Sequence, residues 1–415
     1  MAAPHVTGVA ALIKSTFPEL TTAQIKKAIM ESVDKVAALN GKCVTGGRLN
    51  ANMAMHKARY ANQANWAVDQ TACGDFNGDG KEDVVTIIST KAYNDDTNQI
   101  EMLVSLGGSS QTIPWKIETK YTGSKIVGRV TAGDFNGDGY DDVAMMYDYG
   151  DNLPKIHVFL STGSSFSNWT TWLTQGGYFN PSRIVGRFTA GDFNGDGKDD
   201  IAVMYDYEDH TAKILVCTSK GNGFNYWTTW YAQNTPNYYN VPRVAGRFKA
   251  GDFNGDGKDD IATMYGYADG TTKIHVFPSA GNKFTGCSFW YTESRANYYS
   301  VGRVDDRFTV GDFNNDGKAD VATMYDYENG TMEIHVFLST GTALGNWQRW
   351  KLQRETGTYY VERTSAFVAG DFNGDGKDDV TARYDYAVGI PSLLCFQSTG
   401  SNFAAAQKWI ADIWL

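Results

Sequence analysis

The chain has 415 residues and a mass of 45.7 kDa, long enough for two or three ordinary domains or for one short domain and one large repeat architecture. Its formal net charge of −10 argues against a nucleic-acid partner, because phosphate binding needs a surplus of Lys and Arg on one face. Aromatic residues make up 13% of the chain, and 44 Gly with only 9 Pro favour many short strands joined by glycine turns. No apolar run reaches the roughly 20 residues that a membrane span needs.

The first residues, up to about Lys57, are predicted to be largely helical. The run AAPHVTGVAALIKSTF has apolar residues at helical spacing, Pro18 interrupts it, and TTAQIKKAIMESV resumes the pattern with Thr21 or Thr22 as candidate N-cap. The segment ALNGKCVTGGRLN is expected to be an irregular loop or a short strand pair. We therefore predict a helical segment over 1–60 and a second domain over 61–415.

The five cysteines form an odd set without CxxC spacing, which disfavours a zinc site or a dense disulfide framework. Cys217 and Cys395 lie in apolar strand-like runs, so we predict that both are buried free thiols. One disulfide, between Cys43 and Cys73, is an open alternative.

A nine-residue acidic motif occurs six times, at intervals of 58 to 60 residues. Each copy follows one strand-like run and precedes three more, such as DIAVMYDY, KIHVFLSTG and NWTTWLT. Four strands in a period of this length are typical of one propeller blade, and six blades fit between Trp66 and Leu415. The predicted fold is mostly β: a six-bladed β-propeller of four-stranded blades after a short N-terminal helical segment. The motifs are DFNGDGKED from Asp75, DFNGDGYDD from Asp134, DFNGDGKDD from Asp192, Asp252 and Asp371, and DFNNDGKAD from Asp312.

The motif has the composition of a calcium loop. Positions 1, 3, 5 and 9 are Asp, Asn, Asp and Asp, and position 6 is a Gly that allows a sharp turn. Calcium takes six to eight oxygen ligands, and alternate side chains of a tight loop converge on one point, with a main-chain carbonyl added at position 7. An EF-hand would need Glu at position 12 between two helices, whereas position 12 of the first motif is Thr86 in a predicted strand.

We therefore predict about six Ca²⁺ ions, one in each hairpin loop, with an acidic turn that binds no metal as the alternative. About half of the 47 acidic residues lie in the loops, so the negative charge is concentrated where the calcium ions are predicted to bind. The predicted ligands are Asp75, Asn77, Asp79, Lys81 and Asp83; Asp134, Asn136, Asp138, Tyr140 and Asp142; Asp192, Asn194, Asp196, Lys198 and Asp200; Asp252, Asn254, Asp256, Lys258 and Asp260; Asp312, Asn314, Asp316, Lys318 and Asp320; and Asp371, Asn373, Asp375, Lys377 and Asp379.

Over about 350 residues these repeats resemble FG-GAP or VCBS repeats, the family to which integrin-type propellers belong. The resemblance implies a binding propeller that calcium stabilises, with a glycan or an extracellular protein as its partner. Extracellular calcium modules bind in the ~0.1 to 1 mM range, which suits a secreted protein.

The first residues carry a second resemblance. MAAPHVTGVAALIKSTFPELTTAQIKKAIM, followed by GGRLNANMA, closely resembles the C-terminal end of a subtilisin-like serine protease (subtilase) catalytic domain. In that family the nucleophilic Ser directly precedes this run, and the catalytic Asp and His lie further upstream, so the chain as given supplies no triad. His5 belongs to the family's helix motif and takes no catalytic role.

This second resemblance implies a non-catalytic accessory region of a secreted protease, and it leaves open whether the protein is an enzyme. The alternative is part of an active serine endopeptidase whose triad lies upstream. We expect the chain to be a fragment, or the product of a gene model that starts at an internal Met, with a signal peptide upstream.

Aromatic, arginine and acidic residues recur in most repeats and could together bind glycan. Repeated aromatics more often form the core between blades, and repeated Arg and Asp more often form structural ion pairs, so we favour a structural role for them. The set includes the WxxW pairs Trp169 and Trp172, Trp227 and Trp230, and Trp347 and Trp350; Trp115, Trp290 and Trp409; Arg129, Arg187, Arg247 and Arg307; and Tyr-Asp-Tyr at 147–149, 205–207, 325–327 and 384–386.

Overall fold

The structure is a computed structural model. It describes residues 2–18, 20–31, 34–35, 42, 47–49, 51, 54–55, 68–91, 98–109, 112–150, 153–174, 179–207, 209, 211–235, 239–327, 331–354, 364–385 and 391–410. Two compact units divide the chain, one containing Met1–Ala67 and the other consisting of Val68–Asp385 with Ser392–Ala411. No helix in the described ranges is long and apolar enough to cross a membrane.

The first unit contains the predicted helices, α1 (Ala2–Thr16) and α2 (Thr22–Glu31), and the short strands β1 (Asp34–Lys35) and β2 (Gly47–Arg48), which pair antiparallel. Thr21 is the N-cap of α2: its Oγ1 accepts the Gln24 N–H at 3.3 Å, and Gln24 Oε1 accepts the Thr21 N–H at 2.8 Å. The apolar faces of the two helices meet in a small core that includes Ile13 and Phe17. The helical prediction is confirmed.

The second unit consists of six four-stranded antiparallel sheets, each with its strands in chain order. Their strands are β3 (Val68–Gly74), β4 (Asp83–Lys91), β5 (Asn98–Ser105) and β6 (Thr112–Thr119); β7 (Val130–Gly133), β8 (Asp142–Tyr147), β9 (Lys155–Phe159) and β10 (Thr170–Thr174); β11 (Phe188–Gly191), β12 (Asp200–Asp206), β13 (Ala212–Cys217) and β14 (Thr228–Gln233); β15 (Phe248–Gly251), β16 (Asp260–Gly266), β17 (Thr272–Phe277) and β18 (Ser288–Glu293); β19 (Phe308–Gly311), β20 (Asp320–Asp326), β21 (Thr331–Phe337) and β22 (Gln348–Arg354); and β23 (Thr364–Gly370), β24 (Asp379–Asp385), β25 (Pro391–Phe396) and β26 (Gln407–Ile410).

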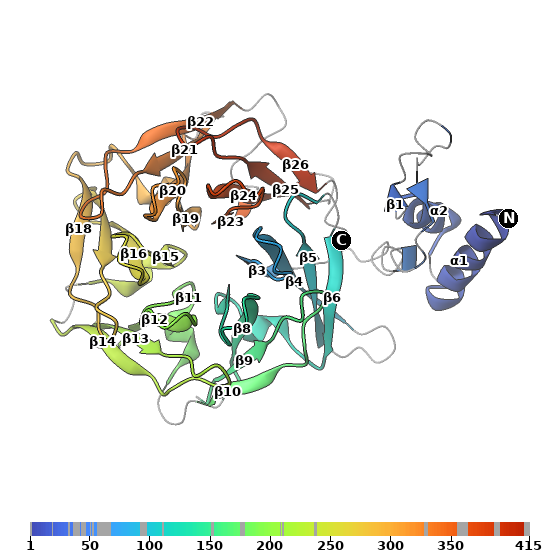
Figure 1. The fold of residues 1–415 in the computed structure, drawn as a ribbon, viewed down its shortest axis with the longest axis horizontal. Helices are drawn as coiled ribbons and strands as arrows, with labels where there is room; N and C mark the ends of the chain where they lie inside the picture. Colours follow the sequence, from blue (N-terminus) through green and yellow to red (C-terminus); the bar gives the residue numbers. More distant parts are fainter. Residues whose placement is uncertain are drawn as a thin grey trace. The chain divides into compact units, whose positions relative to one another are not determined.

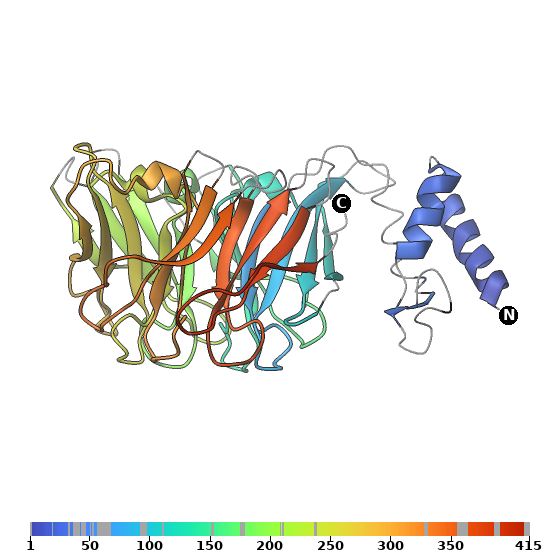
Figure 2. The same ribbon diagram turned by 90° about the horizontal axis from the view of Figure 1, so that it is seen from above.

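These sheets are the six blades of a propeller, numbered 1 to 6 in chain order (Figure 1). The first strand of each blade lies nearest the axis and the fourth lies at the rim (Figure 1), and Figure 2 shows the ring from the side. Neighbouring inner strands contact one another around the ring, and β23 contacts β3, which closes it. The predicted six-bladed propeller is therefore confirmed.

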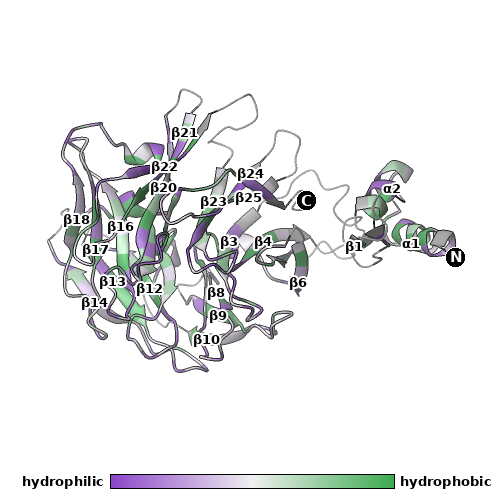
Figure 3. Ribbon diagram, turned by 45° about the horizontal axis from the view of Figure 1, so that its top comes forward, coloured by the Kyte–Doolittle hydropathy of each residue, from purple (hydrophilic) through white to green (hydrophobic). Residues whose placement is uncertain are grey.

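The core lies between neighbouring blades, because both faces of each blade's second strand are apolar. In β12, Ile201 and Val203 pack in a cluster with blade 2, whereas Ala202 and Met204 pack in a cluster with blade 4. The apolar positions therefore follow the strands, as the green segments of Figure 3 show. Each fully buried Val, Ile or Met contributes about 1.5–3 kcal/mol.

Cys217 and Cys395 are buried free thiols, as predicted. Cys73 is also a free thiol, and its Sγ donates to the Ala369 carbonyl at 3.0 Å across the junction of blades 1 and 6. The alternative disulfide is therefore not formed at Cys73, and its other member, Cys43, lies outside the described residues.

Candidate metal centres

The six acidic motifs connect the first strand of each blade to the second, so one topology places all of them on the same face of the ring. The loop between β11 and β12 is representative. Both carboxylate oxygens of Asp192, at position 1, accept main-chain N–H groups: Oδ1 from Gly195 at 2.7 Å and from Asp196 at 3.1 Å, and Oδ2 from Gly197 at 2.8 Å. The position-1 carboxylate thus fixes the backbone of its own loop.

Left-handed backbone at positions 4 and 6 makes the tight turn, with φ of 76° at Gly195 and 78° at Gly197. The fifth motif has Asn315 at position 4, and it takes a φ of 58°, which Asn tolerates better than most residues. At position 5, Asp196 Oδ1 accepts the Lys198 N–H at 3.0 Å and forms an ion pair with Lys198 Nζ at 3.1 Å.

The position-9 carboxyl group is fully buried in all six loops. In the third loop, Asp200 Oδ1 accepts the Ser219 N–H at 2.8 Å, and Asn194 Nδ2, from position 3, lies 3.1 Å from Asp200 Oδ2. Burial raises the pKa of Asp200 to about 7 against the lowering effect of the Ser219 N–H, and the Asp196 and Asp192 carboxylates add to the rise. The same burial raises the pKa of Asp142 and Asp320 to about 8.

These residues fit a hard cation. Oδ2 of Asp83, Asp142 and Asp320 is buried without a hydrogen-bond partner, and so is Oδ1 of Asn254 and Asn314. Buried oxygens of this kind are costly unless something satisfies them, and carboxylate and amide oxygens are the ligands that calcium prefers.

The loops bring the position-3 and position-9 side chains together in the third, fourth and sixth copies, where Asn Nδ2 lies 3.0–3.3 Å from a carboxylate oxygen. In the second and fifth copies the position-3 Asn donates instead to the position-5 carboxylate. The position-1 carboxylate accepts loop N–H groups, and in four copies the position-5 carboxylate forms an ion pair with a Lys ammonium. Across the described ranges, no group of three or more His, Cys, Asp or Glu side chains converges closely enough to hold a metal ion. Calcium binding therefore stays a prediction.

Position 7 has a side-chain role that the sequence analysis missed. A Cβ built on Gly195 would lie 3.1 Å from Cγ of Lys258, the position-7 residue of the next loop, and one on Gly78 would lie 2.6 Å from Cε1 of Tyr140. The position-7 side chain thus covers the position-4 glycine of its neighbour, which leaves little room for any other residue there.

Position 8 links the loops into a closed ring, a role that was also missed. Its N–H donates to the position-1 carbonyl of the preceding loop in all six cases, including the closing bond from Glu82 to Asp371 at 3.1 Å. In four loops its carboxylate accepts the position-1 N–H of the same neighbour; Asp141 Oδ2, for example, lies 2.8 Å from the Asp75 nitrogen. The acid at this position was visible in five of six motifs, but it was interpreted as part of the negative charge at the predicted calcium sites.

A buried serine connects each of five blades to the loop before it. Ser161 donates its hydroxyl hydrogen to the Phe76 carbonyl at 2.6 Å, while its own N–H donates to the position-9 carboxylate of Asp142. The signal was present in the sequence, because a serine recurs 19 residues after position 9 in blades 2 to 6. The other four bonds join Ser219 to Phe135, Ser279 to Phe193, Ser339 to Phe253 and Ser398 to Phe313.

Comparison with known families agrees with this repeat structure. Five overlapping stretches match the family described as FG-GAP-like repeat, at residues 75–145, 134–203, 192–263, 252–323 and 312–382, which together cover most of the chain. The chain belongs to the FG-GAP-like repeat family. The resemblance predicted from the six motifs is thereby confirmed.

Residues 1–72, which precede all five of these stretches, match the subtilase family. No curated protein matches the chain. Solved structures with a similar fold are AofleA from Arthrobotrys oligospora (12% identity, TM-score 0.45, 83% of this chain and 89% of that one) and a fucose-specific lectin from Aleuria aurantia (12%, 0.44, 82% and 95%). Another is an alpha-L-arabinofuranosidase from Clostridium thermocellum (14%, 0.39, 68% and 94%). At these scores none of the three bears on the ligand or activity of this chain.

The recurring aromatic residues of the FG-GAP-like repeats are structural, which is the role that the sequence analysis favoured over glycan binding. The second Trp of each WxxW pair is at most 8% exposed, and Trp172 packs at a tilt on Phe224 of the next blade with ring centroids 5.2 Å apart. The first Trp is half-buried, and Trp169 stacks on His157 at 4.1 Å. The side chain of Trp409 and all of Tyr386 lie outside the described residues.

The recurring arginines are structural as well, although their hydrogen bonds go to main-chain carbonyls where we expected carboxylates. Arg129 donates to the carbonyls of Met146, Pro181 and Lys125. Lys125 lies in the segment that leads into β7, as Arg129 itself does. Burial lowers the pKa of Arg129, and the Asp148 carboxylate opposes that shift.

Proposed function

We propose that this chain is an extracellular binding propeller in which each of the six loops holds one Ca²⁺ ion, and that its ligand is a glycan or a protein. The observation that carries the proposal is the position-9 carboxyl group, which is fully buried in every loop although at least two further acids lie in the same loop. A buried carboxylate costs several kcal/mol unless it is paired, and a divalent cation would supply that pairing. The ions would be structural, because they would hold the connection between the first two strands of each blade.

The membership of the FG-GAP-like repeat family supports this proposal, and so do the buried oxygens without partners at positions 3 and 9. An extracellular location is proposed because calcium loops of low affinity fill only where calcium is millimolar. The subtilase match of residues 1–72 supports a role as an accessory region of a secreted subtilisin-like protease. The DNA upstream of the Met1 codon separates this role from the alternative, because an open reading frame that ends in Gly-Thr-Ser would favour part of an active serine endopeptidase.

The calcium proposal is tested by metal content and thermal unfolding of the purified chain. Elemental analysis after dialysis against millimolar calcium is expected to find about six ions per chain. Excess EGTA is expected to lower the melting temperature substantially, since each site filled to a hundredfold above its Kd adds about 2.7 kcal/mol. Two or fewer ions in folded protein, or equal melting curves with metal removal verified, would overturn it.

Two matched variants test whether calcium binds at a loop or only through the overall negative charge of the chain. Asp200→Asn keeps the shape of the buried group and removes its charge, so it is expected to lose one ion and its share of the calcium-dependent stabilisation. Asp209→Asn, outside the loops, is expected to retain all the ions. If both variants bind equal amounts of calcium, position 9 is not a ligand.

A further inference from the structure

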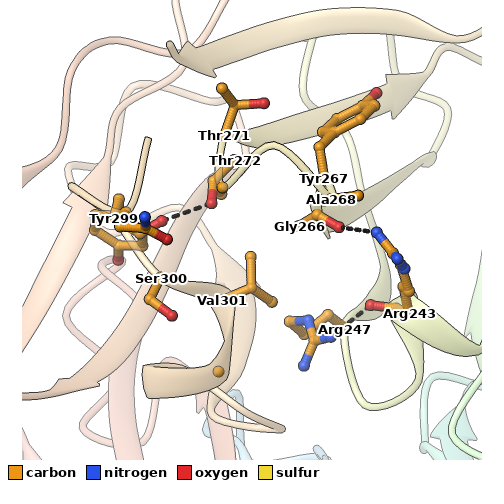
Figure 4. A pocket seen from close by; sticks show the side chains of 13 residues that line it. Arg243, Arg247, Gly266, Tyr267, Ala268, Thr271, Thr272, Tyr299, Ser300 and Val301 are labelled. Atoms are coloured by element: carbon orange, nitrogen blue, oxygen red, sulfur yellow. Dashed lines mark hydrogen bonds between the residues drawn. The ribbon is translucent and has the colours of Figure 1, made fainter. Parts of the chain in front are cut away.

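On the face of the ring opposite the loops, a cavity of about 380 Å³ lies at the junction of blades 4 and 5. Its lining comes from three segments: the entry of blade 4 around η4 (Val241–Val244), the β16–β17 turn, and the segment from Asn297 to Gly302 that enters blade 5. Figure 4 shows Arg243 and Arg247 together on one side of it, with Thr272, Tyr299 and Ser300 on the other. The volume falls in the range of small-molecule sites.

Both arginines are held in place by main-chain carbonyls. Arg247 is only 8% exposed; it donates to the carbonyls of Met264 at 3.3 Å, Arg243 at 2.5 Å and Asp305. Arg243 is exposed and donates to the Gly266 carbonyl at 2.9 Å. A guanidinium has five N–H donors, so donors remain on both side chains beyond these bonds. Spare donors on fixed guanidinium groups suit a planar anion such as a carboxylate.

Four of the other five blades carry an aspartate where blade 4 has Gly266. These are Asp148 in blade 2, Asp206 in blade 3, Asp326 in blade 5 and Asp385 in blade 6, whereas blade 1 has Ser89. In blade 3, Asp206 Oδ1 is buried without a hydrogen-bond partner, and the Asp206 carboxylate raises the pKa of Arg187, the counterpart of Arg247, against the effect of burial. Blade 4 therefore keeps the arginines of this arrangement and lacks its acid.

Gly266 is also why the space is open. A Cβ built there would lie 3.2 Å from Cγ2 of Val301, which lines the cavity, so a larger side chain would project into it. The φ of Gly266 is not among the left-handed ones, so no backbone requirement explains the glycine. What it provides is room beside two arginines.

We propose that this cavity binds the carboxylate of an acidic sugar, a uronic acid residue, beside the position at which blades 2, 3, 5 and 6 carry an aspartate. The sugar is favoured over an apolar acid because the side chains of Thr271, Asn297 and Ser300 bring hydroxyl and amide groups to the lining. The half-buried ring of Tyr267 adds a surface on which a sugar ring can stack. The inference deepens the proposed binding function by naming a ligand class and a site.

Two native carboxylates also act on Arg247. Asp305 and Asp306 partly offset the lowering of its pKa by burial. Both are exposed, so water and salt screen them, whereas a ligand carboxylate beside Arg247 would meet a guanidinium group that is mostly buried. A ligand anion therefore competes favourably with them.

The test is a titration of the calcium-loaded 415-residue chain with methyl glucuronide, and with methyl glucoside as the neutral match, followed by calorimetry or ¹H–¹⁵N NMR. Wild type is expected to bind the glucuronide, and Gly266→Asp is expected to weaken that binding by about tenfold or more, because it supplies the missing carboxylate. Gly266→Ala fills part of the space without adding charge, so it is expected to weaken binding less than Gly266→Asp does.

The arginines supply a matched pair. Arg243→Gln is expected to reduce affinity by about tenfold, whereas Arg183→Gln, which removes the counterpart in blade 3 beside Asp206, is expected to leave it unchanged. Equal binding of the glucoside, equal binding of acetate, or full binding by Gly266→Asp would each overturn the proposal. The metal content of every sample is measured as well, so that failure of the calcium proposal is read separately from failure of this one.

Discussion

Replacing Ser161 by Ala tests how the loops hold neighbouring blades together. The hydroxyl of Ser161 donates to the Phe76 carbonyl at 2.6 Å and accepts the Gly163 N–H at 3.1 Å, and the side chain is only 6% exposed. A buried hydrogen bond contributes about 0.5–1.5 kcal/mol, and a buried partner left unsatisfied costs about 1–3 kcal/mol. We therefore expect Ser161→Ala to lower the free energy of unfolding by about 2 kcal/mol, because Phe76 loses the partner of its carbonyl.

The assay is urea unfolding followed by tryptophan fluorescence, in saturating calcium. Ser164→Ala, an exposed serine of the same turn, is the control and is expected to change the midpoint little. Because Asp142 accepts the Ser161 N–H at 2.8 Å, the double variant with Asp142→Asn should show non-additive losses. Equal midpoints for Ser161→Ala and Ser164→Ala would refute the argument that this bond joins the blades.

Three further outcomes are expected. Gly133→Ala should destabilise the propeller, because the added Cβ would lie 2.2 Å from Oδ2 of Asp199. At Gly281 the nearest atom is 3.5 Å away but φ is 81°, so Gly281→Ala should show the cost of backbone strain alone. Equal urea midpoints for Gly133→Ala and wild type would contradict the first expectation. Burial lowers the pKa of His157 to about 4, and Lys155 adds to the shift, so below about pH 6.5 the unfolded chain binds a proton that the folded chain does not. The stability that the neutral His157 contributes should therefore be lost as the pH falls from 6.5 toward 4. An imidazole NMR titration with a pKa near 6.5 would contradict this. The 415-residue chain should not be labelled by a serine-directed fluorophosphonate, since none of its residues matches the subtilase triad; stoichiometric labelling would show that it holds a nucleophile.

Much of the fold could be predicted because the same signals recur in every repeat. Loop spacing, a glycine at position 6 and four strand-like runs per period agree with one another in each copy, so an error in any one copy would be visible against the others. The apolar character of both faces of strands such as β12 also indicated that blades pack on both sides. The helical start was predictable for a local reason, since Pro18 and the Thr21 cap act within a few residues.

What the sequence did not reveal are contacts between residues far apart in the chain. The bond from the Asp141 N–H to the Asp75 carbonyl spans one whole repeat, and no local pattern distinguishes a predicted metal ligand from an acid that bonds to the preceding blade. The metal ligands named from the sequence stay a prediction, and the division of the loop residues into loop-closing, buried and inter-blade groups follows only from the closed ring. Gly266 was likewise visible as a departure from Tyr-Asp-Tyr, and its meaning depends on the arginines that the fold places beside it.

The same contacts determine how calcium would act on stability. Every loop bonds through positions 1 and 8 to the loops on either side, and in five blades the serine that bonds to position 9 also reaches the loop before it. Loss of one ion would therefore loosen two interfaces between blades as well as one turn. Repeat proteins gain much of their stability at nearest-neighbour interfaces, so two adjacent empty loops should cost less than twice the loss from one, because they share an interface, whereas two empty loops on opposite sides of the ring should cost about twice as much.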